Sequence, residues 1–382
     1  MSANASERAW PADLLDVAEV ADWIAAVLPG RPAVSGPVEI YRSKEWGVTA
    51  RFAVTPGGEP GRAAEGDTDR RDEVVFKASA LPLFSYSPAI YELLNPRFPD
   101  ETPRMLAWDG RGEQTWSLFR PFAGRKLSEA GSPATLVELA RTVARIQTGI
   151  AQAPPGETAH LPYLPARTIP ALFEALLHKI RDRHLAVWRA SGWAVRDIAL
   201  PDDPLGALGR FRGQVEAWSE ELGAGGWPDS IDHVDLHTGN AVLRDDGRVL
   251  VYDWEEAIIG CPFFSLERLL DDARGYDAVG AVRDAFLDAL PWQTRERRER
   301  ALDLALRLAP IKLAYEGEIF AEARGWAGGH PRLTAWCVAR ALQCWEALDA
   351  RHAGGWGWGR RAGGCGREPT ASLRRREGCG TG

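Results

Sequence analysis

The chain has 382 residues, of which 45% are hydrophobic and 26% charged, as in an ordinary globular protein. Its formal net charge of −7 argues weakly against nucleic acid as a partner, and the absence of any apolar run of about 18 residues argues against a membrane span. The N-terminus lacks the basic start and apolar core of a secretory signal, and the five Cys contain no CxxC pair. We therefore expect a cytoplasmic protein.

The N-terminal third predicts one helix followed by a small sheet. Apolar residues in 13–28 recur at helical spacing, which predicts an amphipathic helix within an N-terminal segment 1–35. Residues 36–124 are rich in β-branched and aromatic residues, in segments such as VEIYRSKEWGVTARFAV, DEVVFKAS and WSLFRPF. A Gly-, Pro- and charge-rich stretch at 56–72 separates the first two segments. This region predicts a mostly antiparallel sheet.

Two charged residues in this region require explanation. Lys77 lies on the apolar strand DEVVFKAS, where an ammonium group must find a partner or leave the core. Glu92 follows in SYSPAIYE, a short predicted helix with Ser87 as N-cap and Pro88 in the first turn. We expect a Lys77–Glu92 ion pair; the alternative is an edge-strand Lys and a surface Glu.

Residues 125–352 read as a helical lobe that is interrupted once, at 241–253. Helices are predicted at 133–150, 169–190, 207–222, 265–289, 294–326 and 333–350. Residues 353–382 are rich in Gly and Arg without apolar periodicity, which predicts a disordered tail. The outline is an α+β protein with a strand-rich lobe followed by a larger helical lobe.

The stretch HVDLHTGN, residues 233–240, is the densest group of chemically active side chains. As a strand it would place His233, Asp235 and His237 on one face, as in a metal site. As a loop it has the form H-x-D-x-x-x-x-N, the phosphoryl-transfer pattern in which the Asp positions a hydroxyl. A polar turn is the third reading. The other His of the chain form no HxH or HExxH pattern, which disfavours zinc and makes backbone hydrogen bonds the better role for His233 and His237.

The following residues, AVLRDDGRVLVYD, predict a β-hairpin with its turn at Asp-Asp-Gly. The first strand begins after Asn240 and the second ends before Asp253, so the two side chains should meet at the open end of the hairpin. An amide oxygen and a carboxylate suit Mg²⁺, which keeps several waters and binds substrate phosphates. Asp235 lies only five residues upstream. The sequence therefore predicts a site for magnesium and a nucleotide.

These motifs resemble the aminoglycoside phosphotransferase and choline kinase-like family, relatives of the protein kinases that phosphorylate small molecules. HVDLHTGN is similar to the family signature HxDLHxGN, and VYDWEEAIIGCPFFSLERLL to its strand–DWE–G-x-P–L segment. The resemblance covers about 36–350 and implies a protein-kinase-like, two-lobed fold that uses ATP and Mg²⁺. It implies that Asp235 is the catalytic carboxylate and that Asn240 and Asp253 bind the metal.

The same resemblance assigns the nucleotide site in the N-terminal lobe. Lys77 would bind phosphate with Glu92 as its partner, and the backbone of Arg120 and Phe122 would face adenine at a hinge around FAG. The chain departs from its relatives in three respects. It has no GxGxxG, and its phosphate-side turn SKEWGVTA has the single Gly47; the stretch 56–72 is long; and Ile-Gln replaces the usual Leu-His in the first helix of the C-terminal lobe.

The expected function is transfer of the ATP γ-phosphate to a hydroxyl of a small molecule. Residues 213–290 hold 17 Asp and Glu against five Arg, which suits a cationic acceptor such as an aminoglycoside-type antibiotic. A sugar, amino alcohol or nucleoside is the metabolic alternative. A protein kinase is disfavoured, because no APE motif or activation loop follows Asp253. A nucleotide-binding regulator without catalysis is the alternative from another class.

Overall fold

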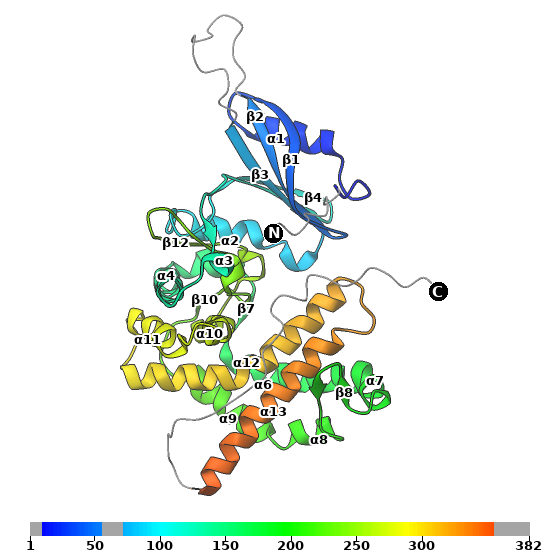
Figure 1. The fold of residues 1–382 in the computed structure, drawn as a ribbon, viewed down its shortest axis with the longest axis vertical. Coiled ribbons are helices and arrows are strands. Elements are labelled where there is room, and N and C mark those ends of the chain that lie inside the picture. Colours follow the sequence, from blue (N-terminus) through cyan, green and yellow to red (C-terminus); the bar gives the residue numbers. More distant parts are fainter. Residues whose placement is uncertain (1–9, 56–71, 355–382) are drawn as a thin grey trace, which may run out of the picture.

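The structure, a computed structural model, describes residues 10–55 and 72–354, with side chains up to residue 348. It has two lobes (Figure 1): a sheet with helix α1 (Val17–Val27) above, and a larger helical lobe below. The stretch 56–71 and the predicted tail beyond residue 354 lie outside the described residues. Within the described ranges, no helix is long and apolar enough to cross a membrane.

The N-terminal lobe is built on a five-stranded antiparallel sheet, as predicted. The strands lie in the order β1-β2-β3-β5-β4 and are β1 (Ala33–Lys44), β2 (Gly47–Thr55), β3 (Asp72–Ser79), β4 (Met105–Arg111) and β5 (Gln114–Phe119). Strand β4 is not among the predicted strands, because MLAWDGR ends in turn-forming residues and has one half-buried face. Pairing with β5 makes it the sheet edge.

Helix α1 covers one face of this sheet. Asp16 caps it by accepting hydrogen bonds from the N–H groups of Ala18 (2.6 Å) and Glu19 (3.2 Å). Its buried Trp23 contacts Phe76 and Trp116 edge to face, with ring centroids 5.9 and 5.6 Å apart. The predicted amphipathic helix is therefore part of the N-terminal lobe and holds strands β3 and β5 in place.

Helix α2 (Ser87–Leu94) lies between the lobes (Figure 1) and confirms the short helix predicted after Lys77. Its predicted cap is wrong: Tyr86 occupies the N-cap position without a side-chain hydrogen bond, and Ser87 is the first helical residue. Pro88 lies in the first turn as predicted, where its missing N–H costs nothing. Tyr91 and its apolar neighbours face the core, so the helix is anchored by packing.

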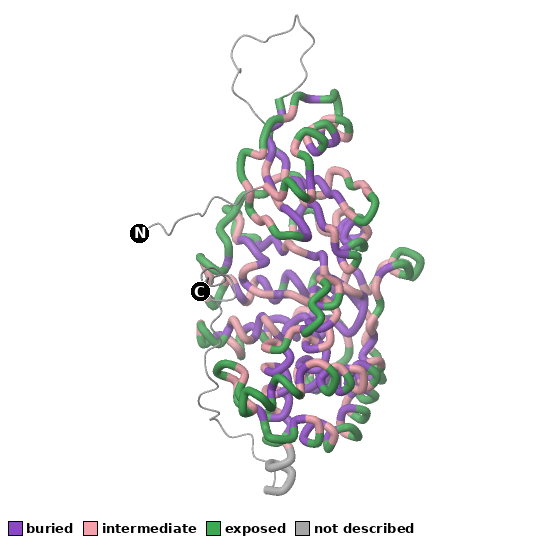
Figure 2. The backbone as a smooth tube through the Cα atoms, turned by 90° about the vertical axis from the view of Figure 1, so that its right-hand side faces the viewer, coloured by how far each residue is buried: buried purple, intermediate pink, exposed green. Residues whose placement is uncertain are grey.

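The helical lobe refines the predicted boundaries by splitting three of the long segments. Its principal helices are α4 (Pro133–Ile150), α6 (Ile169–Lys179), α7 (Leu185–Ala190), α8 (Pro204–Gly209), α9 (Arg212–Gly223), α10 (Leu266–Arg274), α11 (Val279–Ala289), α12 (Arg295–Ala323) and α13 (Pro331–Gly354). A π-helical turn, 180–184, divides α6 from α7. Figure 2 shows the buried backbone running through the middle of this lobe, where large side chains such as Trp188, Phe263 and Trp345 form one continuous core.

An apolar cluster ties the β1–β2 turn to the helical lobe. The Trp46 ring lies 5.7 Å from that of Phe84 and 6.0 Å, edge to face, from that of Phe320 on α12. Beside it, Arg324 forms an ion pair with Glu45. The contact fixes the ends of β1 and β2 over the region between the lobes, where the predicted site residues meet.

Candidate active site

The loop that carries Asp235 leaves strand β10 (Ser230–Asp232) through a tight turn. Val234 has φ of +67°, and the Asp235 N–H donates to the His233 carbonyl at 2.8 Å. A hydrogen bond from residue i+2 to residue i, with positive φ at the residue between them, defines the rarer and more strained form of the γ-turn. A β-branched residue such as Val234 rarely adopts this conformation. The Asp232 carboxylate accepts the Val234 N–H at 3.0 Å. The loop is thus held in an unusual conformation immediately before Asp235.

The Asp235 carboxylate is surrounded by donors. Asn240 Nδ2 donates to its Oδ2 at 3.1 Å and to its backbone carbonyl at 2.9 Å. His237 Nε2 lies 3.5 Å from Oδ2, and Arg268 binds Oδ1. Burial alone would raise the pKa of Asp235, but His237 and Arg268 outweigh it and hold that pKa well below its usual range. Asp235 is therefore ionised at neutral pH.

The predicted hairpin is confirmed. Strands β11 (Ala241–Leu243) and β12 (Val249–Val251) pair antiparallel, with Ala241 opposite Val251. At the open end the Tyr252 N–H donates to the Asn240 carbonyl at 2.9 Å, so Asn240 and Asp253 lie on neighbouring segments of the backbone. Asp253 has φ of +68°, which turns the chain sharply after β12. Asn240 and Asp253, two residues beyond the last paired residue Val251, thus both lie at the open end of the hairpin.

Lys77 reaches the same point from strand β3. Its Nζ lies 2.6 Å from Asp253 Oδ1 and 2.9 Å from Glu255 Oε2, with exposed side-chain fractions of only 18%, 25% and 7% for the three residues. Burial alone would lower the pKa of Lys77, but the two carboxylates raise it above its ordinary value. Burial tends to raise the pKa of Asp253, yet Lys77 brings it below normal, whereas the pKa of Glu255 stays raised because burial prevails. The ammonium group is therefore charged and shared between two carboxylates.

The predicted Lys77–Glu92 pair is wrong in this structure. Glu92 is exposed and accepts a hydrogen bond from Trp108 Nε1 on β4 at 2.7 Å. On helix α2 the neighbouring Tyr91 points inward instead, and its hydroxyl accepts the Trp254 N–H at 3.4 Å. Adjacent residues of a helix face directions about 100° apart, so the face that buries Tyr91 turns Glu92 away. The partner of Lys77 is Glu255, which lies far along the chain.

The two His of the loop make backbone hydrogen bonds, as expected. His233 Nε2 lies 3.0 Å from the Tyr252 carbonyl, and the ring packs on Trp254 with centroids 4.4 Å apart. His237 Nδ1 accepts the Gly239 N–H at 3.0 Å. Among the described residues, no group of three or more His, Cys, Asp or Glu is arranged to hold a metal ion. Both His shape the loop.

The predicted hinge follows strand β5. The Arg120 N–H donates to the Arg104 carbonyl at 2.9 Å, so only the carbonyl of Arg120 is available to a ligand. The Phe122 ring, 39% exposed, lies 5.6 Å from the ring of Tyr252. Through this contact the hinge touches Tyr252, which directly precedes Asp253 and is hydrogen-bonded to Asn240. An aromatic face beside a carbonyl is a suitable surface for a planar base.

Two glycines permit close approach of backbones around the site. A Cβ on Gly47 would lie 2.5 Å from the Ala78 carbonyl oxygen on β3, so the single glycine of the β1–β2 turn serves strand packing. Gly124 has φ of +149°, and its Cβ would lie 2.7 Å from the Leu243 carbonyl oxygen. The hinge therefore docks directly on the hairpin that carries Asn240.

Several residues of the site escape sequence reasoning. Arg268 on α10 binds Asp235, and Asp272 on the same helix accepts the Thr238 N–H at 2.8 Å and its hydroxyl at 2.6 Å. Asp271 pairs with Arg340 on α13. Both carboxylates are therefore engaged in contacts within the protein. The available signal was spacing: Asp271 and Asp272 directly follow the SLERLL segment, and Asp272 lies about one helical turn after Arg268 on α10.

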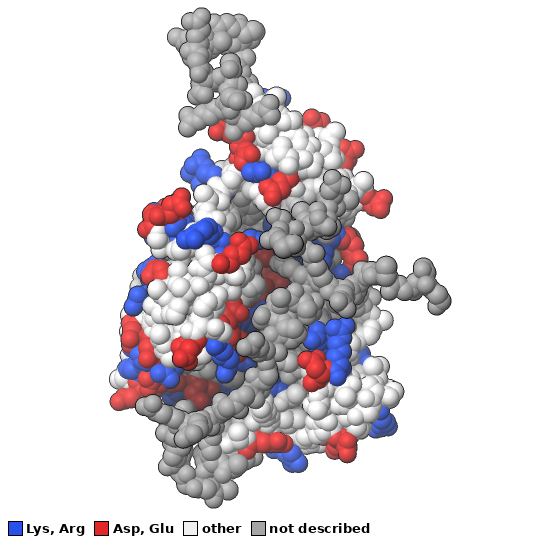
Figure 3. Space-filling model, viewed as in Figure 1, with Lys and Arg blue, Asp and Glu red and all other residues white. Residues whose placement is uncertain are grey.

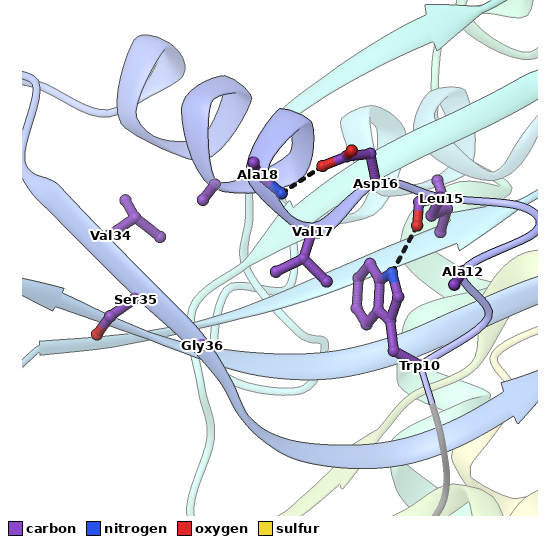
Figure 4. Close-up of a pocket in the computed structure, with 10 residues that line it drawn as sticks. Trp10, Ala12, Leu15, Asp16, Val17, Ala18, Val34, Ser35 and Gly36 are labelled. Carbon is purple, nitrogen blue, oxygen red and sulfur yellow. Dashed lines mark hydrogen bonds between the residues drawn. The ribbon is translucent and has the colours of Figure 1, made fainter.

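A surface pocket lies elsewhere, on the N-terminal lobe. It is bounded by the N-terminal segment, α1 and β1, among them Trp10, Val17 and Val34 (Figure 4). Trp10 Nε1 donates to the Leu15 carbonyl at 2.6 Å, so this N–H is already hydrogen-bonded within the pocket wall. The pocket is shallow, and none of the predicted site residues lines it.

The sequence profile of the phosphotransferase enzyme family matches residues 89–302, more than half of the chain. The chain belongs to this family. The match includes Asp235, Asn240 and Asp253 but begins after Lys77. No curated protein sequence matches the chain.

Solved structures show the fold of this phosphotransferase at low sequence identity. Choline kinase from Cryptosporidium parvum Iowa II is 10% identical with a TM-score of 0.56, covering 88% of this chain and 97% of its own. Macrolide 2'-phosphotransferase type I is 14% identical with a TM-score of 0.52, covering 86% and 98%. A thermostable mutant of aminoglycoside phosphotransferase APH(4)-Ia, in a ternary complex with ADP and hygromycin B, is 15% identical with a TM-score of 0.51, covering 82% and 95%. The protein-kinase-like, two-lobed architecture predicted from the sequence is confirmed.

Proposed function

We propose that this phosphotransferase moves the γ-phosphate of ATP to a hydroxyl of a small, cationic molecule. The observation that carries the proposal is the convergence of Asp235, Asn240, Asp253 and Lys77 from three separate segments on one point between the lobes. Phosphoryl transfer requires little covalent chemistry from a protein; it requires positioning and neutralisation of charge. These four residues supply both.

Asp235 would accept the hydrogen bond, and then the proton, of the acceptor hydroxyl. The hydroxyl oxygen attacks the γ-phosphorus, the bond from that phosphorus to the β–γ bridging oxygen breaks, and ADP leaves with the electron pair. Arg268 neutralises Asp235 in the resting site. When the acceptor binds, its hydroxyl would therefore have to replace one of the donors that now contact the Asp235 carboxylate. The base would lie at the hinge, against the Arg120 carbonyl and Phe122, and Lys77 would bind the phosphates.

The donor set fits Mg²⁺. Since the Nδ2 group of Asn240 is engaged by Asp235, its amide oxygen is the atom that it can offer to a cation. Lys77 occupies Oδ1 of Asp253, while Oδ2 has only Arg42 at 3.9 Å. Two hard oxygen ligands are few for a protein cage but suit a Mg²⁺ ion that also binds phosphates and water. When bound, the ion would supply positive charge that offsets the charge developing on the phosphates.

Glu256, whose pKa responds to the charge of Asp235, favours a cationic acceptor, and Glu316, paired with Lys312 at 2.6 Å, is a second interior carboxyl. Burial, and then the negative charges of Asp235 and Asp253, raise the pKa of Glu256 to about 8. Burial likewise raises the pKa of Glu316 to about 7, although Lys312 opposes the shift. An ammonium group placed beside such carboxyls would favour their ionised forms and gain attraction in return.

The outer acidic residues of the helical lobe contribute less to this selectivity. Figure 3 shows acidic and basic side chains interspersed over the face it presents. Many of the acidic side chains in 213–290 are paired, as Asp246 is with Arg248 and Asp284 with Arg295. Exposed pairs of this kind are largely self-neutralising. The acidic character that matters for an acceptor is therefore mainly that of Glu256, since Glu316 is itself paired with Lys312.

A protein substrate is disfavoured by the segment after Asp253. In the described residues 254–265, two 3₁₀ turns flank strand β13 (Ile258–Gly260), and α10 begins at Leu266. This stretch is fully used in packing and has no room for an activation loop of the protein-kinase type.

The test is a panel of acceptors incubated with MgATP, with ADP release and phosphorylated product measured by mass spectrometry. The panel contains aminoglycosides, macrolides, choline and neutral sugars, and Asp235→Asn is the control. We expect transfer to cationic acceptors and a loss of about 10²–10⁴-fold in the control with ATP affinity retained. Transfer to neutral sugars alone would support a metabolic kinase, and ATP binding without transfer to any acceptor would support a regulator.

A further inference from the structure

A buried ion pair lies beneath the loop that carries Asp235. Lys312, near the middle of α12, places Nζ 3.0 Å from Oδ2 of Asp232, the last residue of β10, and 2.6 Å from Oε1 of Glu316 on its own helix. Lys312 and Asp232 are 4% and 1% exposed. Removing one partner of such a pair leaves an uncompensated charge in the interior, so the pair is strongly coupled. Neither residue has a part in the proposed transfer.

The Asp232 carboxylate is the centre of a hydrogen-bonded network from four elements. Ser265 Oγ donates to Asp232 Oδ1 at 2.7 Å and accepts the His233 N–H at 3.1 Å. Gln147 on α4 donates from Nε2 to Ser265 Oγ at 3.1 Å and to the Ile231 carbonyl at 3.0 Å. Each of these side chains is buried and makes at least one hydrogen bond or ion pair within the network, which restricts its movement.

The network ends on the strained turn. The same Oδ1 atom that accepts the Ser265 hydroxyl also accepts the Val234 N–H, at 3.0 Å. Val234 has φ of +67°, a conformation that a β-branched residue keeps only where the surroundings determine it. Asp235 follows directly, and its N–H closes the turn on the His233 carbonyl. Whatever fixes Asp232 therefore fixes the direction in which the Asp235 carboxylate points.

We propose that Asp232, Ser265 and Lys312 are positioning residues, which hold the left-handed turn at Val234 and so aim Asp235 at the acceptor hydroxyl. The proposal rests on the function proposed above. Lys312 gives Oδ2 of Asp232 its partner and fixes the carboxylate, while Ser265 and Val234 share Oδ1. A helix remote in sequence thus sets the geometry of the loop. A displacement of about 1 Å in such a group can cost on the order of 10²-fold in rate.

The first test is the kinetics of Lys312→Met. We expect kcat to fall about 10²-fold while KM for ATP changes little, because Lys77, Asp253 and the hinge are untouched. The matched control is Glu318→Gln, which removes a buried charge from the same helix but contacts His184 and Thr334 instead of the loop. This control should melt at a lower temperature and keep its kcat. Equal losses of kcat in both variants would overturn the proposal.

The second test is rescue by glycine. Glycine adopts positive φ without strain, so adding Val234→Gly to Lys312→Met should restore at least about tenfold of the lost kcat. A pair that only stabilised the fold would give no such recovery, and its absence would contradict the proposal. If Lys312→Met does not fold, Ser265→Ala replaces it, since it deletes only the hydroxyl that joins Asp232 to the His233 N–H.

A crystal structure of Lys312→Met, or of Ser265→Ala in its place, separates this proposal from the proposed function. We expect Val234 to leave the positive-φ region and the Asp235 carboxylate to move from Asn240 Nδ2. An unchanged loop would overturn the positioning role whatever the activity. Failure of the wild-type protein to phosphorylate any acceptor would instead refute the proposed function, and the loop geometry of the variant would still decide the present proposal.

Discussion

Replacing Lys77 by Met removes the ammonium group between Asp253 and Glu255 and leaves two neighbouring carboxylates in a largely buried place. Removal of one partner from a buried ion pair costs about 3–5 kcal/mol. Because Asp253 keeps a quarter of its side chain exposed, we take the lower end, about 3 kcal/mol. With an unfolding entropy of about 2.1 cal/mol/K per residue, a chain of 382 residues should then melt about 4 °C lower.

The measurement is the melting temperature in EDTA, followed by calorimetry. Lys179→Met is the matched control, because Lys179 is similarly exposed (17%) and pairs with Glu322, where Arg183 remains as a second cation. This control should lose less than about 1 kcal/mol. Adding Glu255→Gln to Lys77→Met should recover part of the loss, because only one carboxylate then remains unpaired.

The same variant has a pH signature. In the wild type Lys77 keeps the pKa of Asp253 below its usual value; without Lys77, burial would raise it. A carboxyl whose folded pKa is raised binds more protons in the folded than in the unfolded state, so stability falls as pH rises above the unfolded pKa. The deficit of Lys77→Met should therefore grow between about pH 4 and pH 7. A melting temperature within 1 °C of the wild type across this range would refute the electrostatic account.

Three further predictions concern other parts of the site. Because the pKa of Glu256 is raised to about 8, stability should fall from about pH 4.5 to 8; Glu256→Gln should flatten this slope by up to about 1.4 kcal/mol per pH unit, as followed by melting temperature. Gly124→Ala should destabilise by about 1–3 kcal/mol in urea denaturation, since its Cβ would meet the Leu243 carbonyl oxygen. Asp272→Ala should cost about 1–3 kcal/mol in the same assay by leaving the Thr238 N–H without its acceptor, and equal stability would show that water replaces the carboxylate.

The part of the site that could be predicted from the sequence is local. The hairpin after Asn240 has two apolar strands of three residues around a turn, and antiparallel pairing brings its ends together whatever the rest of the chain does. The juxtaposition of Asn240 and Asp253 therefore follows from about fourteen consecutive residues. Helix α4 is also local, since Ser132 caps it and Pro133 starts it.

Contacts between distant segments could not be predicted in this way. Glu92 lies nearer to Lys77 in sequence than Glu255 does, yet Glu255 forms the ion pair with Lys77. Which carboxylate meets Lys77 depends on the rotation of helix α2 about its axis, and that rotation is set by burial of Tyr91 against the other lobe. Arg268 poses the same problem, because an exposed-looking Arg on a helix gives no sign that a loop 33 residues upstream approaches it.

In the site without ligands, each charged side chain proposed to act in the reaction is paired with another charged side chain of the protein, which a ligand could replace. Arg268 balances Asp235, and Lys77 balances Asp253 and Glu255, so each of these charges has a partner before ligands arrive. In the proposed reaction Lys77 would bind the phosphates and Asp253 would offer its carboxylate to a cation, so each charge would again have a partner. Arg268, with 42% of its side chain exposed, can move into solvent as the acceptor hydroxyl arrives. Asp232 and Lys312 differ from these pairs, because both side chains are almost closed off from solvent and their positive and negative partners all come from the protein, Glu316 included. The exchangeable pairs therefore serve binding, while the permanent pair preserves the geometry on which that binding depends.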